Sequence, residues 1–130
     1  MINIALKLYL DSSFTDEVSQ ETNINPDICH GSGTTGFVSK RQLWIKNDDI
    51  VKYYEDIIIT AVNDTSDISV TYSSTENGTY TDNLSLDDIG TYGEEDDSTT
   101  FWRKATISKG VSQQNKTDIV YRITATECDV

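Results

Sequence analysis

The sequence predicts an all-β protein: a single antiparallel β-sandwich of the immunoglobulin-like class, with about seven strands and at most one short helix. Three observations predict this class. Apolar and polar residues alternate in several short runs, which is the period of a strand with one buried face. Clusters of Gly, Asn, Asp and Ser separate these runs. Alanine, which favours helices, occurs only four times in 130 residues.

The amino-terminal run, residues 2–10, is the first predicted strand, and it belongs in the core. Its inward side holds Ile2, Ile4, Leu6, Leu8 and Leu10. A side-chain period of two places these residues on one face of a strand. Asn3 and Lys7 interrupt the run, so it lacks the continuous apolar stretch of a secretory signal. We therefore expect a chain that is made in the cytoplasm without a signal peptide.

The middle of the chain contains four further candidate strands and one candidate helix. The strands are expected at residues 37–47, 56–62, 68–73 and 80–86. Turn clusters rich in Gly, Asn, Asp and Ser bound them. Residues 48–55 follow Asn47, a residue type that caps helices, and begin with two aspartates that would favour the positive end of a helix dipole. We expect a short helix there at most.

The last third of the chain predicts an antiparallel hairpin. Residues 101–107 and 119–126 alternate between apolar and polar, and a polar loop with Gly110 joins them. In the second run, one face holds Ile119, Tyr121, Ile123 and Ala125. In the first run, Arg103 shares its face with apolar residues. These strands complete the sandwich, and because no linker or repeat divides the chain, residues 1–130 are expected to form one domain.

The charge of the chain excludes some classes of partner. With 22 acidic and 10 basic residues, the formal net charge is −12, which would repel the phosphates of DNA or RNA. No run approaches the roughly 18 apolar residues that a membrane-spanning helix needs, so we expect no membrane partner. The acidic loop 86–97 has two interpretations, a calcium site or a solvated surface. We favour the solvated surface, without metal or cofactor, because EF-hand spacing is missing.

Two motifs that suggest chemistry lack the required context. Residues 31–36, GSGTTG, match the spacing of a dinucleotide-binding fingerprint, but residues 37–45 read as a strand where that motif needs a helix. His30 is the only histidine, so a serine or cysteine triad would have to use it, and we expect an exposed polar residue there instead. Cys29 and Cys128 are expected to be free thiols. We predict no catalytic residue and no enzyme activity.

Aromatic residues give the last functional signal. Trp44 lies between Leu43 and Ile45, and Trp102 follows Phe101, so one ring of each group should face away from the core. The candidate interface residues are Trp44, Tyr53, Tyr54 and Trp102. Three alternatives stay open for them: cover by a second sheet or loop, a protein interface, or a platform for sugars.

The strand pattern resembles a known family over most of the chain. Residues 101–127, FWRKATISKGVSQQNKTDIVYRITATE, resemble the closing hairpin of small virion structural proteins of tailed bacteriophages, with an Asn-Lys-Thr-Asp-like turn and a Thr-Ala-Thr-Glu end. Residues 42–62, QLWIKNDDIVKYYEDIIITAV, are similar to the central part of the same proteins. The likeness extends to the amino-terminal strand and to residues 11–19, DSSFTDEVS, whereas residues 75–97 carry none of it.

The resemblance implies a non-enzymatic structural component of a tailed-phage virion. Its leading implied role is a capsid decoration or cement protein that binds the particle surface, and the alternative is a neck, tail or baseplate protein. The implied partners are the major capsid protein or neck and tail proteins, together with copies of the chain itself. A carbohydrate-binding module for host recognition is the alternative from a different class, and it would use the tryptophans.

Overall fold

The computed structural model describes residues 5–18, 20, 27–30, 36–61, 68–107, 110, 115–119 and 121–130. These residues form ten strands and no helix. The strands are β1 (Leu6–Tyr9), β2 (Glu17–Val18), β3 (Asp27–His30), β4 (Phe37–Asn47), β5 (Lys52–Ala61), β6 (Ile68–Ser73), β7 (Asn83–Leu86), β8 (Ser98–Ile107), β9 (Asn115–Ile119) and β10 (Tyr121–Asp129). None of the described residues forms a helix that could cross a membrane.

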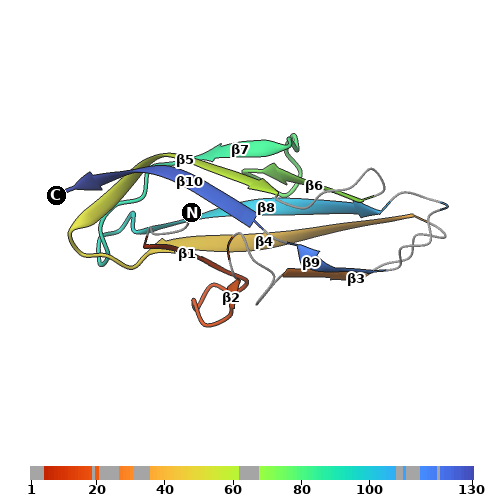
Figure 1. Cartoon of the computed structure of the whole chain (residues 1–130), viewed down its shortest axis with the longest axis horizontal. Coiled ribbons are helices and arrows are strands. Elements are labelled where there is room, and N and C mark those ends of the chain that lie inside the picture. Colours follow the sequence, from red (N-terminus) through yellow and green to blue (C-terminus); the bar gives the residue numbers. More distant parts are fainter. Residues whose placement is uncertain are drawn as a thin grey trace.

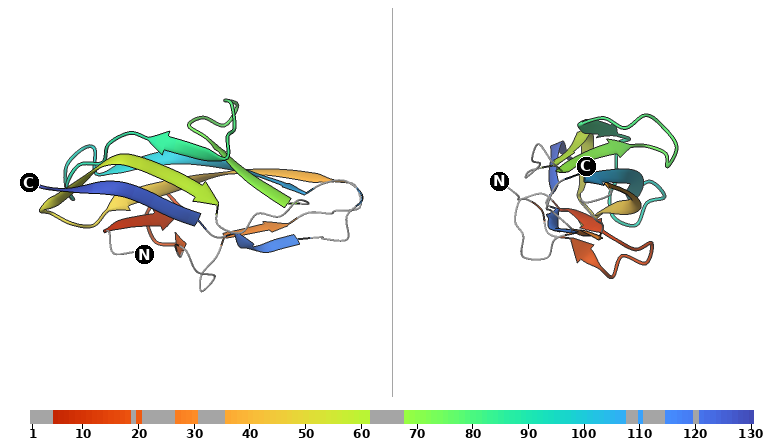
Figure 2. Two further views of the ribbon diagram at one scale, coloured as in Figure 1. Left: turned by 45° about the horizontal axis from the view of Figure 1, so that its top comes forward. Right: turned by 90° about the vertical axis from the view of Figure 1, so that its right-hand side faces the viewer.

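The strands form an antiparallel β-sandwich, which confirms the predicted fold class. One sheet has five strands in the order β2-β1-β4-β8-β6, and the facing sheet has three in the order β10-β5-β7. A separate two-stranded ribbon pairs β3 with β9. Figures 1 and 2 show an elongated molecule whose strands follow its long axis. The C-terminus lies at the end where β4 turns into β5, and the β3-β9 ribbon lies toward the opposite end (Figure 1).

Alternation builds the core between the two sheets. In β4, Leu43 and Ile45 are fully buried, and in β10 the predicted inward face of Tyr121 and Ile123 is confirmed. Ile123 lies opposite Ile59 of β5, which is also buried. The apolar residues of β1 belong to the same core cluster, whereas Ile2 and Ile4 lie outside the described residues. Removing these side chains from water is the main favourable term for the fold.

The short helix considered for residues 48–55 is absent, and that expectation is wrong. The Asn47 side-chain oxygen accepts a hydrogen bond from the Asp49 amide at 2.9 Å, and the Asp49 carboxylate accepts one from the Val51 amide at 2.8 Å. Two consecutive turns of this kind reverse the chain instead of starting a helix. β5 then begins at Lys52, four residues before the predicted start.

A bulge in β5 hides this strand from a period-two pattern. Thr124 pairs with Ile58 but Thr126 pairs with Glu55, so β5 contains one residue more than β10 at this point. Asp56 supplies it with a φ of 52°, a left-handed conformation that Asp tolerates better than most residues. As a result Tyr54 is buried before the bulge and Ile57 after it. Three residues rather than two separate them, so the alternation changes phase.

Three strands come from segments in which no strand was predicted, apart from Ile119 at the end of the third. They are β2, β3 and β9. The other seven strands correspond to the seven predicted runs. The hairpin predicted from residues 101–107 and 119–126 is wrong, because β8 pairs with β4 and β6 in the large sheet whereas β10 pairs with β5 in the facing sheet. The two-residue β2 closes the edge of the large sheet beside β1, where a short strand limits the exposure of unpaired backbone groups.

Candidate functional site

The outer face of the five-stranded sheet brings the two tryptophans together. Trp44 lies opposite Thr100 and Trp102 lies opposite Gln42. Their chain neighbours Leu43 and Phe101 are fully buried, so alternation places both indoles on the outer face. They are diagonal neighbours across two paired strands, a spacing of about 7–8 Å that large rings can bridge. The expected outward facing of both tryptophans is confirmed, and both side chains are half-buried.

Two further rings continue this row across β1. Tyr9 lies opposite Trp44 in the β1-β4 pair and points to the same outer side, since Leu8 is in the core. The Phe14 ring packs edge-on against Tyr9 with centroids 5.4 Å apart. Phe14 has a φ of 57°, an uncommon conformation for a bulky residue, in the loop between β1 and β2. Asp11 accepts hydrogen bonds from the Thr15 and Asp16 amides and so stabilises that loop.

Lysines flank the aromatic row on the same face. Lys40 and Lys104 lie opposite each other, and their ammonium groups lie 5.4 and 4.7 Å from the centroid of the Tyr80 ring. Lys46 lies 4.5 Å from the Phe14 ring centroid and 3.3 Å from the Asp97 carboxylate. We call this surface the aromatic–lysine face. It comprises Lys7, Tyr9, Phe14, Lys40, Trp44, Lys46, Tyr80, Trp102 and Lys104.

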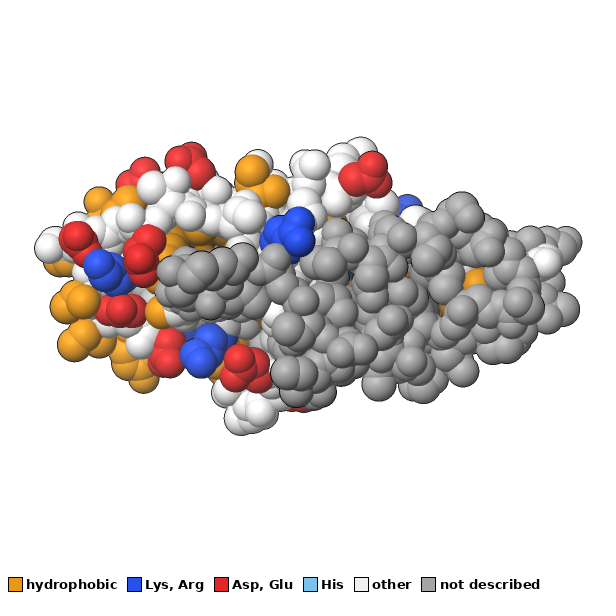
Figure 3. Space-filling view, in the orientation of Figure 1, with side chains coloured by type: hydrophobic (Ala, Val, Ile, Leu, Met, Phe, Trp, Pro, Cys, Tyr) orange, Lys and Arg blue, Asp and Glu red, His pale blue; other side chains and the backbone are white. Residues whose placement is uncertain are grey.

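Four exposed apolar side chains lie close together at the end of the molecule that holds the β4–β5 turn. Ile50, Val51, Tyr92 and Val130 are apolar and remain 69%, 56%, 47% and 83% exposed. Two backbone hydrogen bonds join the three segments: Tyr92 N–H donates to the Asp49 carbonyl, and Val130 N–H donates to the Val51 carbonyl. We call these four residues the apolar tip. Figure 3 shows hydrophobic and acidic side chains at this end, with a basic side chain between them.

Asn47 positions the apolar tip from beneath. It is fully buried, and its side-chain amide donates to the carbonyls of Lys52 at 2.8 Å and Gly90 at 2.9 Å. Its backbone N–H donates to the Asp97 carbonyl at 2.8 Å. One side chain therefore ties the β4–β5 turn to the acidic loop, and the sequence signal for this role was the Asn-Asp-Asp run itself.

An open acidic pocket adjoins the tip. It has a volume of about 410 Å³. Its wall includes Tyr53 and Val130, and its carboxylates are Glu55, Asp88, Glu94 and Asp96. Over the described part of the chain, no group of three or more His, Cys, Asp and Glu side chains could hold a metal ion. Of the four interface candidates, Tyr53 is thus placed at a pocket.

Tyr54, in contrast, is a core residue and is corrected as an interface candidate. Its side chain is fully buried. The hydroxyl donates to the Glu127 carboxylate at 2.8 Å and accepts from the Ala5 amide at 2.9 Å. The phase change at the Asp56 bulge turns this ring inward, so the adjacent tyrosines serve different purposes.

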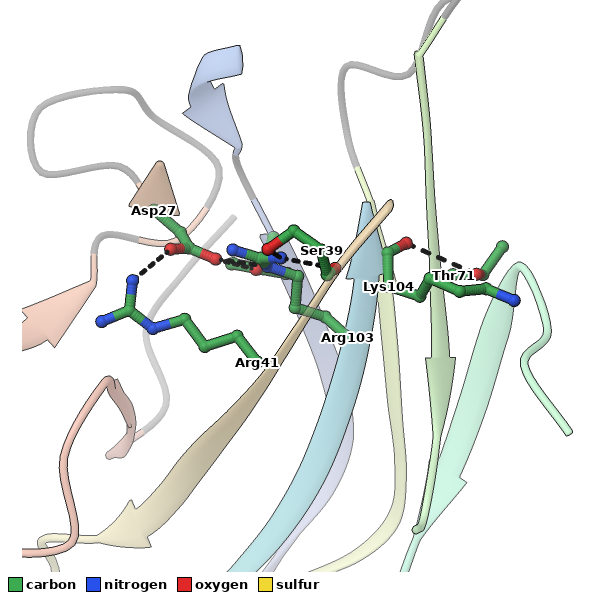
Figure 4. Close-up of polar contacts among 7 residues, drawn as sticks. Asp27, Ser39, Arg41, Thr71, Arg103 and Lys104 are labelled. Carbon is green, nitrogen blue, oxygen red and sulfur yellow. Dashed lines mark hydrogen bonds and ion pairs between the residues drawn. The ribbon is translucent and has the colours of Figure 1, made fainter. Parts of the chain in front are cut away.

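A buried polar network lies on the inner side of the large sheet. Arg103 is 1% exposed and Asp27 is fully buried. The Arg103 Nε–H donates to Asp27 at 2.8 Å, and the Tyr121 hydroxyl donates to the same carboxylate at 2.6 Å. Arg41 contacts the other carboxylate oxygen at 3.2 Å (Figure 4). Arg103 also donates to the Ser39 carbonyl at 2.9 Å. The network joins β3, β4, β8 and β10, that is, all three sheets.

Figure 4 also shows that adjacent cations of β8 lie on different sides of the large sheet. Arg103 points toward Asp27, and its neighbour Lys104 points away from it on the other side of the strand. One cation is therefore neutralised inside the fold, where an unpaired charge would be costly, and the next is presented on the outer face.

The tyrosines of the core should make folding stability fall at alkaline pH. Burial raises the pKa of Tyr54 to about 12, and burial next to the Asp27 charge raises the pKa of Tyr121 well above its usual value. Above pH 10 the unfolded chain loses these protons while the folded chain keeps them, so rising pH favours unfolding. We expect urea midpoints to fall between about pH 10 and 12. Tyr54→Phe should flatten this slope, and an unchanged slope would contradict the assignment.

Most of the remaining sequence candidates cannot be placed, because they fall outside the described residues. The side chains of Cys29 and His30, and residues 31–35 of the glycine cluster, lie outside the described residues. Cys128 is a free thiol. Comparisons of this chain with protein-family models, with curated proteins and with solved structures find no match.

Proposed function

We propose that this protein is a non-enzymatic structural component of a tailed-phage virion, with capsid decoration or cementing as its leading role. A neck, tail or baseplate position is the alternative within this class. The protein would bind the major capsid protein or neck and tail proteins, and copies of itself. The observation that carries the proposal is the aromatic–lysine face. Aromatic side chains are enriched at protein interfaces, and here they form a row on one side of a sheet whose other side is the core.

The resemblance of residues 42–62 and 101–127 to small virion proteins supports the same role. These segments include the parts of β4 and β8 that supply both tryptophans, and the two strands pair along ten residues. A particle component also needs a fold that stays intact while neighbours attach to it. The buried network around Asp27, which joins all three sheets, supports that requirement.

The direct test is the composition of purified particles. Particles of the phage that encodes the chain would be purified on a density gradient and analysed by quantitative mass spectrometry. We expect the chain to co-purify with the particle. Hundreds of copies would place it on the head, whereas a ring of six or twelve would place it on the tail axis. Its absence from purified particles, together with its presence in the infected-cell lysate, would refute the proposal.

Carbohydrate binding is the second candidate, and the neighbouring positions of Trp44 and Trp102 favour it. Two rings on one flat sheet can stack against successive sugars. A glycan array tests this with the purified protein. Binding that is lost in Trp44→Ala and in Trp102→Ala, but kept in the tip variant Ile50→Ala, would support a sugar platform. Wild-type protein that binds no glycan would eliminate it.

A further inference from the structure

Positive charge is distributed unevenly over this strongly acidic chain. The chain has 10 basic and 22 acidic residues, yet four lysines lie on the aromatic–lysine face as two opposed pairs, Lys7 with Lys46 and Lys40 with Lys104, at different points along β4. Lys46 is paired with Asp97. Lys40 and Lys104 are opposite each other and share the Tyr80 ring. Placing two like charges on directly opposed residues is unfavourable, so this pair is a strong local attractor for an anionic surface.

Trp102 makes this pair of lysines part of a mixed patch. It lies two residues before Lys104 on β8, and opposite Gln42, two residues after Lys40 on β4. The patch therefore offers an aromatic surface and two ammonium groups on one side of the sheet. A matching surface needs exposed apolar side chains beside carboxylates.

The apolar tip of the same protein has that composition. Its exposed apolar side chains come from the β4–β5 turn, the loop after β7 and the last residue of the chain. Glu94, Glu95 and Asp96 are exposed in the same loop as Tyr92. The carboxylate of Asp129, next to Val130, is 79% exposed but pairs with Lys52, so the acidic groups that the tip offers to another molecule are those of Glu94, Glu95 and Asp96. Contiguous exposed apolar side chains with a polar rim are typical of interaction sites.

We infer that two copies of this protein associate through two different surfaces: the apolar tip of one copy docks on the aromatic–lysine face of another. The tip's apolar side chains cover Trp102, and its carboxylates reach Lys40 and Lys104. This inference extends the proposed function, from which it takes the expectation that many copies meet. Its test uses purified protein alone, so its failure and the failure of particle binding can be told apart.

The contact is heterologous, because it joins two different surfaces. After pairing, one copy still has a free aromatic–lysine face and the other a free apolar tip. Further copies can therefore add, and the product is a closed ring or an open chain. We therefore expect species larger than a dimer, which grow with protein concentration. Because opposite charges face each other, they should dissociate as salt rises.

A charge-swap experiment tests the pairing. The face variant is Lys40→Glu with Lys104→Glu, and the tip variant is Glu94→Lys with Glu95→Lys. Sedimentation velocity would compare each protein in low and high salt. We expect the wild type to associate in low salt and each variant alone to bind itself at least tenfold more weakly. An equimolar mixture of the two variants should regain association, since the basic tip meets the acidic face. Recovery on mixing also shows that both variants are folded.

The control keeps the charge change and moves it away from the tip. Asp82→Lys with Asp87→Lys alters the net charge as the tip variant does, at exposed positions on either side of β7. It should associate like the wild type. A wild-type chain that stays monomeric at millimolar concentration would overturn the inference, as would a mixture that fails to regain association. A monomeric wild type whose glycan binding depends on Trp102 would assign the face to sugars instead.

Discussion

Replacing Ile123 with Asp is expected to unfold the domain. Ile123 is 7% exposed and lies opposite the fully buried Ile59 between the two sheets. Ile123 belongs to the apolar core cluster, and a charge buried among apolar side chains costs several kcal/mol. Total stability of a domain is typically only about 5–15 kcal/mol. Thermal unfolding followed by circular dichroism should show loss of the cooperative transition.

Thr124→Asp is the matched control for this prediction. Thr124 is the next residue of β10, is exposed, and lies opposite Ile58, which is 37% exposed. The same carboxylate placed there stays in water, so stability should change by about 0.5 kcal/mol or less. Equal losses in the two variants, or a cooperative transition in Ile123→Asp, would show that the facing of β10 is misassigned.

The sandwich and the inward faces of its long strands could be predicted because each depends on local alternation. The outward facing of Trp44 and Trp102 followed from the same rule. That the two tryptophans are neighbours could not be predicted in this way. It depends on the β4-β8 register, which joins segments more than fifty residues apart. Single-strand patterns contain no information on which residue lies opposite which, so the aromatic–lysine face emerges only once the strands are paired.

The β5 region shows where alternation fails. Asp56 adds one residue to the strand, so the buried positions change phase between Tyr54 and Ile57. The sequence does not show this bulge. The Asn-Asp-Asp run therefore resembles the start of a helix, and Tyr53 and Tyr54 both resemble surface residues. The helix-capping role expected of Asn47 is wrong, because no helix follows it. Its side chain instead bonds the Asp49 amide within a turn and the carbonyls of Lys52 and Gly90.

The position of Arg103 on an apolar strand face is a sequence signal for the buried network. Arg103 shares a strand face with Phe101 and Ala105, and an arginine on an apolar face requires a buried anion nearby. That anion is Asp27, which lies outside the predicted strands. The pairing spans 76 residues, so only the folded chain reveals it.

Asp27→Ala is the second variant with a large expected effect. The substitution leaves the Arg103 guanidinium buried without its carboxylate and removes the acceptor of the Tyr121 hydroxyl. Breaking a buried ion pair from one side costs about 3–5 kcal/mol. Denaturation in urea should show this loss as a lower midpoint. Arg41→Ala is the control, because its side chain is 39% exposed and its contact with Asp27 should contribute about 1 kcal/mol or less.

A second substitution separates the network's charge from its packing. In Asp27→Ala with Arg103→Met, the uncompensated cation is gone and an apolar side chain of similar length fills its place. Replacing a buried ion pair by apolar residues is often neutral, so the double variant should recover most of the stability that Asp27→Ala loses. The single variant Arg103→Met completes the comparison. If the stability losses of Asp27→Ala and Arg103→Met simply add in the double variant, Arg103 stabilises the fold through contacts other than Asp27. The Ser39 carbonyl, 2.9 Å from its guanidinium, would then be the partner to test.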